Sequence, residues 1–116
     1  MVREKRANAS DSASSSGYSE RKITQLRELK TLFWGLEQDE GIRFVADVPG
    51  YDKGAFVFLT KFDDRFCINF KERVFEESSK EFVPGGKEQW KYFETPETAW
   101  NYVNKYLKSP LEAYYY

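Results

Sequence analysis

The 116-residue chain contains no histidine, and this absence weakens the case for an enzyme. Histidine is the side chain that most often carries general acid–base catalysis near neutral pH. The neighbouring carboxylates Asp63 and Asp64 lie in a predicted turn, where polar residues are favoured for backbone reasons alone. We therefore expect a protein that is not an enzyme and that has no catalytic residue.

Residues that hold metals and cofactors are also scarce. Cys67 is the single cysteine, which excludes an internal disulfide and a cysteine-based zinc site. It lies in the middle of a predicted strand, with no histidine to activate it, and this favours a packing role over a nucleophile. The run from Pro84 to Lys87 lacks the upstream glycine and the Ser/Thr of a phosphate-binding loop. We expect neither a metal nor a cofactor.

The chain has no long apolar run and almost no net charge. No stretch is long enough to span a bilayer, and no apolar segment near Met1 suggests a secretory signal. Eighteen basic residues nearly balance nineteen acidic ones, for a net charge of -1, so no overall field favours nucleic acid or an anionic membrane. We expect a cytoplasmic, intracellular chain with no membrane partner, in which any charge-based function is local.

Bulky apolar residues are nearly absent from residues 1–19, which contain six serines. Such a segment buries too little surface to offset the entropy lost on ordering. We therefore predict a flexible Ser-rich tail over residues 1–19 and a single α+β domain over residues 20–108. Residues 109–116 are expected to form a short Tyr-rich C-terminal tail.

The chain is rich in aromatic residues, and between Ala55 and Phe75 they alternate with other residues. The alternation continues on both sides of a polar break at Asp63, Asp64 and Arg65. It predicts two antiparallel strands, each with one face in the core. The side chains that we assign to the core face are Phe56, Phe58, Phe62, Phe66, Ile68 and Phe70.

Further strands and two helices complete the predicted domain. Strands are expected over residues 42–48, 55–62 and 65–77, and a last strand over 81–94 that is interrupted at Pro84–Gly86. Apolar residues three and four apart predict a helix over about 20–38. Thr95 and Pro96 predict the start of a second helix, which Pro110 ends. The expected fold class is α+β: a four-stranded antiparallel β-meander with an N-terminal helix and a C-terminal helix packed on the sheet.

The second face of the predicted sheet is mixed in character. If Phe66, Ile68 and Phe70 face the core, the residues between them lie on the other face with basic and apolar neighbours. Our candidate interaction face consists of Arg43, Val45, Val57, Leu59, Lys61, Arg65, Lys71 and Arg73. An apolar patch with a basic border needs a cover. The N-terminal helix, a protein partner and a second copy of the chain are alternative covers.

Two functions remain open. One is a small non-enzymatic protein-interaction or regulatory domain that acts through the sheet face or an aromatic surface. The candidate aromatic residues are Trp34, Trp100, Tyr102, Tyr106 and Tyr114–Tyr116. The alternative is a single-stranded DNA/RNA-binding protein that uses a basic stripe on the sheet, extended by Lys91. The aromatic residues needed for base stacking are assigned to the core, which disfavours the alternative. The sequence thus favours protein interaction, with a protein partner or self-association.

Overall fold

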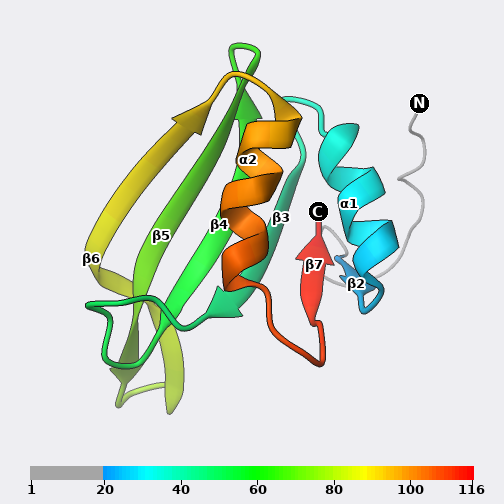
Figure 1. Ribbon diagram of the computed structural model, residues 1–116. Coiled ribbons are helices and arrows are strands. Elements are labelled where there is room, and N and C mark those ends of the chain that lie inside the picture. Colours follow the sequence, from blue (N-terminus) through cyan, green and yellow to red (C-terminus); the bar gives the residue numbers. More distant parts are fainter. Residues whose placement is uncertain (1–19) are drawn as a thin grey trace.

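The computed structural model describes residues 20–116 as one antiparallel sheet with two helices (Figure 1). The strands are β2 (Arg21–Ile23), β3 (Gly41–Ala46), β4 (Ala55–Phe62), β5 (Arg65–Glu76), β6 (Glu81–Phe93) and β7 (Ala113–Tyr115), and the helices are α1 (Leu26–Trp34), α2 (Pro96–Val103) and a 3-10 turn (Asn104–Tyr106). The six strands lie in the order β2-β7-β3-β4-β5-β6. The α+β class and the antiparallel sheet are confirmed, but the sheet has six strands, not four. The predicted tail over residues 1–19 lies outside the described residues.

Strands β3 to β6 form the predicted meander. Asp63 and Asp64 both have positive φ, 55° and 64°, as the two-residue turn that suits a hairpin requires. At the β3–β4 connection Gly54 has φ 80°, and a Cβ there would come within 2.9 Å of the Ala46 carbonyl oxygen. Local turn chemistry therefore sets both hairpins.

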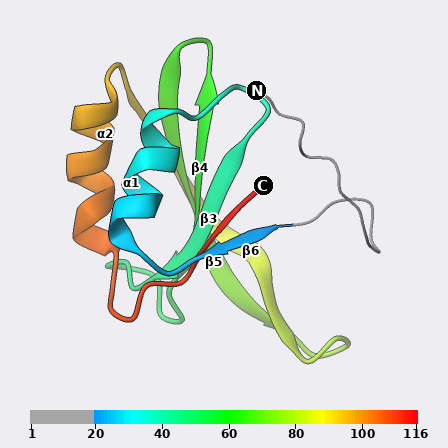
Figure 2. The ribbon, with the colours of Figure 1, turned by 90° about the vertical axis from the view of Figure 1, so that its right-hand side faces the viewer.

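Strand β6 continues through the predicted interruption at Pro84–Gly86. The pairing of β5 with β6 shifts between Lys71 and Glu72, and Gly86 takes φ 60° there. The irregularity is therefore a bulge within one long strand. Beyond it, residues 72–76 and 81–86 form a two-stranded hairpin extension that projects from the sheet (Figure 2).

The two ends of the described chain pair with each other, which the sequence did not predict. Residues 21–23, expected to be helical, form β2, and α1 occupies only residues 26–34 of the predicted 20–38. The segment expected to be a C-terminal tail supplies β7, which lies between β2 and β3. Gly41 and Tyr116 also exchange backbone hydrogen bonds of 2.9 Å. A strand of three residues shows too little alternation to be predicted from the sequence, because its pairing partner lies far away along the chain.

Both helices pack on the same face of the sheet (Figure 2). The ring of Phe33 in α1 lies 5.0 Å from Phe66 of β5 and 5.9 Å from Trp100 of α2, centroid to centroid. Tyr102 lies 6.2 Å from Phe70, further along β5. The Thr95 hydroxyl accepts a 3.2 Å hydrogen bond from the backbone N–H of Thr98, which confirms the predicted helix start. The N-terminal helix therefore does not cover the second face.

The side chains of β4 face opposite to our expectation. Val57 and Leu59 are buried in the core, where they lie opposite Phe70 and Ile68 of β5. Phe56 and Phe58 lie opposite Lys71 and Asn69 on the other face, together with Phe62. The reason is the two-residue turn: it makes Phe62 and Arg65 direct partners, and directly opposite residues share a face. Phe66, Ile68 and Phe70 do lie in the core, as predicted.

Candidate functional site

The candidate site is the sheet face turned away from both helices, which we call the open face. No helix or strand formed by residues 20–116 lies over it (Figure 2). One row of paired residues crosses all six strands on this face: Lys22, Tyr114, Arg43, Phe58, Asn69 and Trp90. Basic, aromatic and amide side chains therefore alternate across the sheet.

Aromatic residues are concentrated on the open face. By register and alternation its aromatic side chains are Phe56, Phe58, Phe62, Phe75, Phe82, Trp90, Tyr92, Tyr114 and, over Gly41, Tyr116. Trp90 and Tyr92 are 49% and 53% exposed, and Phe62 is 63% exposed. Large exposed apolar side chains gathered on one surface are typical of a binding site.

Basic side chains lie between these rings. The guanidinium of Arg73 is 4.3 Å from the centroid of Phe82 and 5.6 Å from that of Phe56. The guanidinium of Arg65 is 5.3 Å from the centroid of Tyr92. Cation–π contacts of this kind hold the cations close to the aromatic surface. The open face thus offers positive charge and flat apolar rings at the same places.

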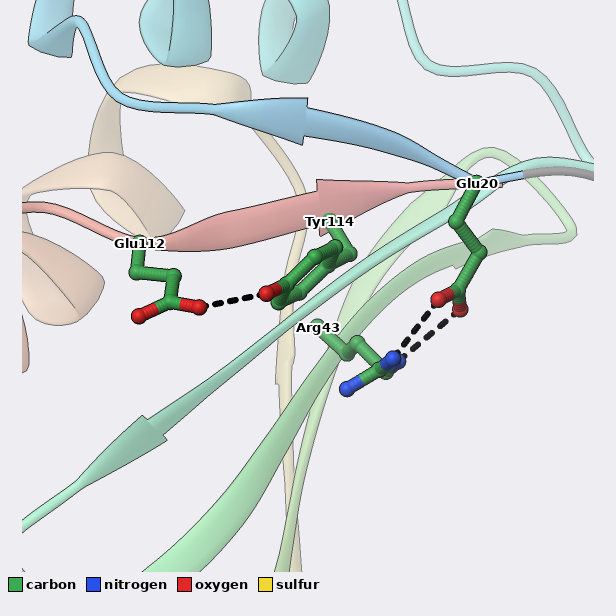
Figure 3. A network of polar contacts seen from close by, with 4 residues as sticks. All are labelled: Glu20, Arg43, Glu112 and Tyr114. Carbon is green, nitrogen blue, oxygen red and sulfur yellow. Dashed lines mark hydrogen bonds and ion pairs between the residues drawn. The ribbon is translucent and has the colours of Figure 1, made fainter.

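Acidic residues neutralise one end of the open face, formed by β2, β7 and β3. Glu20 accepts hydrogen bonds of 2.6 and 2.9 Å from the guanidinium of Arg43 (Figure 3). The Tyr114 hydroxyl donates to the carboxylate of Glu112, which also lies 3.8 Å from the ammonium of Lys22. The Tyr114 hydrogen bond, helped by Lys22, lowers the pKa of Glu112, and the same bond raises the pKa of Tyr114. This end carries little net positive charge.

The other end, on β5 and β6, keeps more of its positive charge. Lys71 pairs with Glu88 at 3.6 Å, but neither Arg65 nor Arg73 forms an ion pair with a carboxylate of residues 20–116. Arg73 donates one hydrogen bond of 3.2 Å to the Lys53 carbonyl, and its buried Nε has no partner among the described atoms. The guanidinium of Arg65 and the second terminal nitrogen of Arg73 therefore remain as donors for an anionic ligand.

Two residues of the open face, Asn69 and Cys67, are buried among larger neighbours. Asn69 donates hydrogen bonds to Glu88 at 3.1 Å and to the Gln89 carbonyl at 3.2 Å. Burial raises the pKa of the Cys67 thiol, although the charge of Arg65 acts in the opposite direction. A protonated, buried thiol is a poor nucleophile, so the structure supports a packing role for Cys67.

The structure divides the eight candidate residues between the two faces. Five lie on the open face: Arg43, Val45, Arg65, Lys71 and Arg73. Val57 and Leu59 lie in the core instead, and Lys61 lies on the helix side, 5.5 Å from the ring of Phe66. Lys91 also lies on the helix side, opposite Ile68. Trp100 is buried beneath α1, whereas Trp34 is partly exposed there.

Sequence reasoning did not place the aromatic residues of β4 and β6 on the open face. A usable signal was present, because a two-residue turn at Asp63 and Asp64 already implies that Phe62 accompanies Arg65. Applied along β4, that register brings Phe56 and Phe58 to the basic face. Trp90 and Tyr92 follow from the pairing of β6 with β5, which the sequence does not specify.

Comparison with known proteins adds no family to this description. Within residues 20–116, no group of three or more His, Cys, Asp or Glu side chains is placed to hold a metal ion. No helix in that range is long and apolar enough to cross a membrane. No protein-family model matches the chain, and neither a curated protein nor a solved structure is significantly similar to it.

Proposed function

We propose that the open face binds single-stranded nucleic acid. Proteins that bind single strands without sequence preference combine a basic track for phosphates with exposed aromatic rings on which bases stack. The observation that carries this proposal is the register of β4, which puts Phe56 and Phe58 on the same face as Arg65, Lys71 and Arg73. The sequence-based objection, that the aromatic residues are needed in the core, does not apply to these phenylalanines.

The positions of the charges favour the β4–β6 end of the open face as the path of the strand. Glu20 and Glu112 neutralise the β2–β7 end and would repel phosphate there. Arg65 and Arg73 stand beside aromatic rings and are free of carboxylate partners among the described residues. Stacking on these rings needs unpaired bases, because the faces of bases in a duplex are already stacked. Duplex DNA should therefore bind more weakly.

The test is fluorescence anisotropy of labelled single-stranded DNA and RNA oligomers, with duplex DNA for comparison, over a range of salt. Each lost phosphate contact reduces the salt slope of binding to a single strand by about 0.7, so the double variant Arg65→Gln/Arg73→Gln should lower it by about 1.4. The control is Arg27→Gln/Lys30→Gln, which removes the same charge from exposed positions on α1. Absence of binding at low salt, or an equal loss in the control, would refute the proposal.

A second candidate function is protein binding through self-association, and the hairpin extension favours it. Val74 and Phe75 are exposed on opposite sides of this ribbon, although a two-stranded ribbon alone has no core to bury them. Its tip carries Glu76, Glu77 and Glu81, and Lys80 pairs with Glu77 at 3.1 Å, so the tip keeps a net negative charge. This charge is complementary to the basic end of the open face, so a second copy of the chain is the occupant that fits.

Sedimentation velocity over a concentration series tests the second candidate. Self-association should weaken in Phe75→Ser and at high salt, because it depends on an apolar contact and on charge complementarity. The control is Leu26→Ser, which removes a similarly exposed apolar side chain from α1, on the other side of the sheet. A chain that stays monomeric at all concentrations would exclude this candidate without affecting the nucleic-acid proposal.

A further inference from the structure

We infer that Trp90 and Tyr92 form a slot that receives one unpaired base of a bound strand. The inference rests on the proposed function and specifies where a base is held. The two rings are nearly parallel, with an interplanar angle of 7° and 6.2 Å between their centroids. Same-face neighbours on a strand are about 6.7 Å apart, so this spacing follows from their positions on β6.

The spacing is close to that needed for an inserted base. Stacked aromatic planes approach to about 3.5 Å, the optimal distance between carbon atoms, so a base between two rings needs about 7 Å. The observed centroid distance of 6.2 Å is shorter than this by less than 1 Å. Small rotations of the two side chains supply the missing distance. A centroid distance of 6.2 Å also lies within the range of offset stacking, so the two rings can contact each other while no base is bound. An entering base therefore takes the place of this contact.

The position of Arg65 supports a face-to-face arrangement. On β5, Arg65 comes before Cys67 and Asn69. Cys67 lies opposite Tyr92, and Asn69 lies opposite Trp90. The order along the open face is therefore Arg65, Tyr92, Trp90. The Arg65 guanidinium lies over the Tyr92 ring, and cations are attracted to ring faces. Tyr92 thus presents one face to Arg65 and the other to Trp90. A base in the slot would place its phosphate within reach of Arg65.

The slot is also accessible. Strand β6 is at the edge of the sheet, so no further strand of residues 20–116 borders Trp90 and Tyr92 on that side. Both side chains are about half exposed and lie beside buried Asn69 and Cys67, their partners on β5. A base can enter from solvent without displacing core residues. Since every base has a flat face, the slot should accept all bases of DNA or RNA with only modest preference.

The experiment compares two probes of equal length and charge: a single-stranded oligothymidylate and its fully abasic counterpart. Anisotropy titrations are run on the full chain and on Trp90→Ala, Tyr92→Ala and the double variant, with Trp34→Ala on α1 as the control. The wild-type chain should prefer the oligothymidylate by roughly tenfold or more, and each single variant should lose the share of that preference that the slot contributes, while stacking on the phenylalanines of the open face keeps the rest. Binding of the abasic strand should be unchanged.

The double variant separates a slot from two independent stacking sites. A base held between both rings loses its site when either ring is removed, so the double variant should bind about as weakly as each single variant. Losses that multiply in the double variant would overturn the slot. Equal wild-type affinity for both probes would also overturn it while leaving phosphate binding by the open face intact. Binding of neither probe would refute the proposed function itself.

Discussion

Two neighbouring residues of β4, Phe58 and Leu59, should respond to truncation in different ways. Leu59 is fully buried opposite Ile42 and Ile68, beneath the helices. Phe58 points to the open face between Arg43 and Asn69 and is only partly buried. The substitutions Leu59→Ala and Phe58→Ala therefore test which side of β4 is the core and which is the binding surface.

The structure sets the expected magnitudes. Leu59→Ala leaves a cavity in a packed core, which costs about 2–5 kcal/mol in the free energy of unfolding. For a domain of this size that lowers Tm by at least about 8 °C. Phe58→Ala should cost less stability, because part of its ring is already in water. If a base stacks on Phe58, the same change should weaken oligonucleotide binding by about 1–3 kcal/mol, or roughly 5- to 150-fold.

Urea unfolding followed by tryptophan fluorescence gives the stability of each variant, and anisotropy at fixed low salt gives its affinity. Binding is measured at a temperature where both variants are folded. Leu59→Ala should then bind as the wild type does, while Phe58→Ala should not. If Phe58→Ala proved the more destabilising of the two and left affinity unchanged, our assignment of the faces of β4 would be refuted.

Three further predictions concern α2, the tyrosines beside it and the buried thiol. Thr95→Ala should lower the free energy of unfolding in urea by about 1 kcal/mol, because it removes the hydrogen bond from the Thr98 N–H. Thr95→Ser keeps a hydroxyl and should retain most of this stability. Equal destabilisation by both substitutions would argue against the helix cap. Burial, with a hydrogen bond to Tyr106, raises the pKa of Tyr102 to about 12. The contribution of the protonated Tyr102 to the stability of the fold is therefore complete below pH 10 and is lost as pH rises through 12. Ultraviolet titration should show late-ionising tyrosines, of which Tyr102→Phe removes one, and an unchanged titration would contradict the assignment. Burial also raises the pKa of Cys67, so a thiol-specific reagent should label the native chain far more slowly than the urea-unfolded chain, and equal rates would show that the thiol is exposed.

Several elements of the fold can be predicted from strong local signals in the sequence. Alternation predicts β4 and β5, the pair Asp63–Asp64 predicts the turn between them, and Thr95 with Pro96 predicts the start of α2. Each of these signals depends on residues within a few positions of one another. For that reason they can be read without knowing the rest of the fold.

Which elements meet, and which face of the sheet is buried, depend on contacts between residues far apart in the sequence. Strands β2 and β7 are too short to have a pattern of their own, and they form because opposite ends of the domain pair. On β4 both faces are apolar, with Phe56 and Phe58 on one and Val57 and Leu59 on the other, so alternation alone cannot choose the core. The choice follows from the register with β5 and from the packing of Phe33 and Trp100 on one side of the sheet. Because both helices bury the aliphatic side of β4, its phenylalanines remain on the open face.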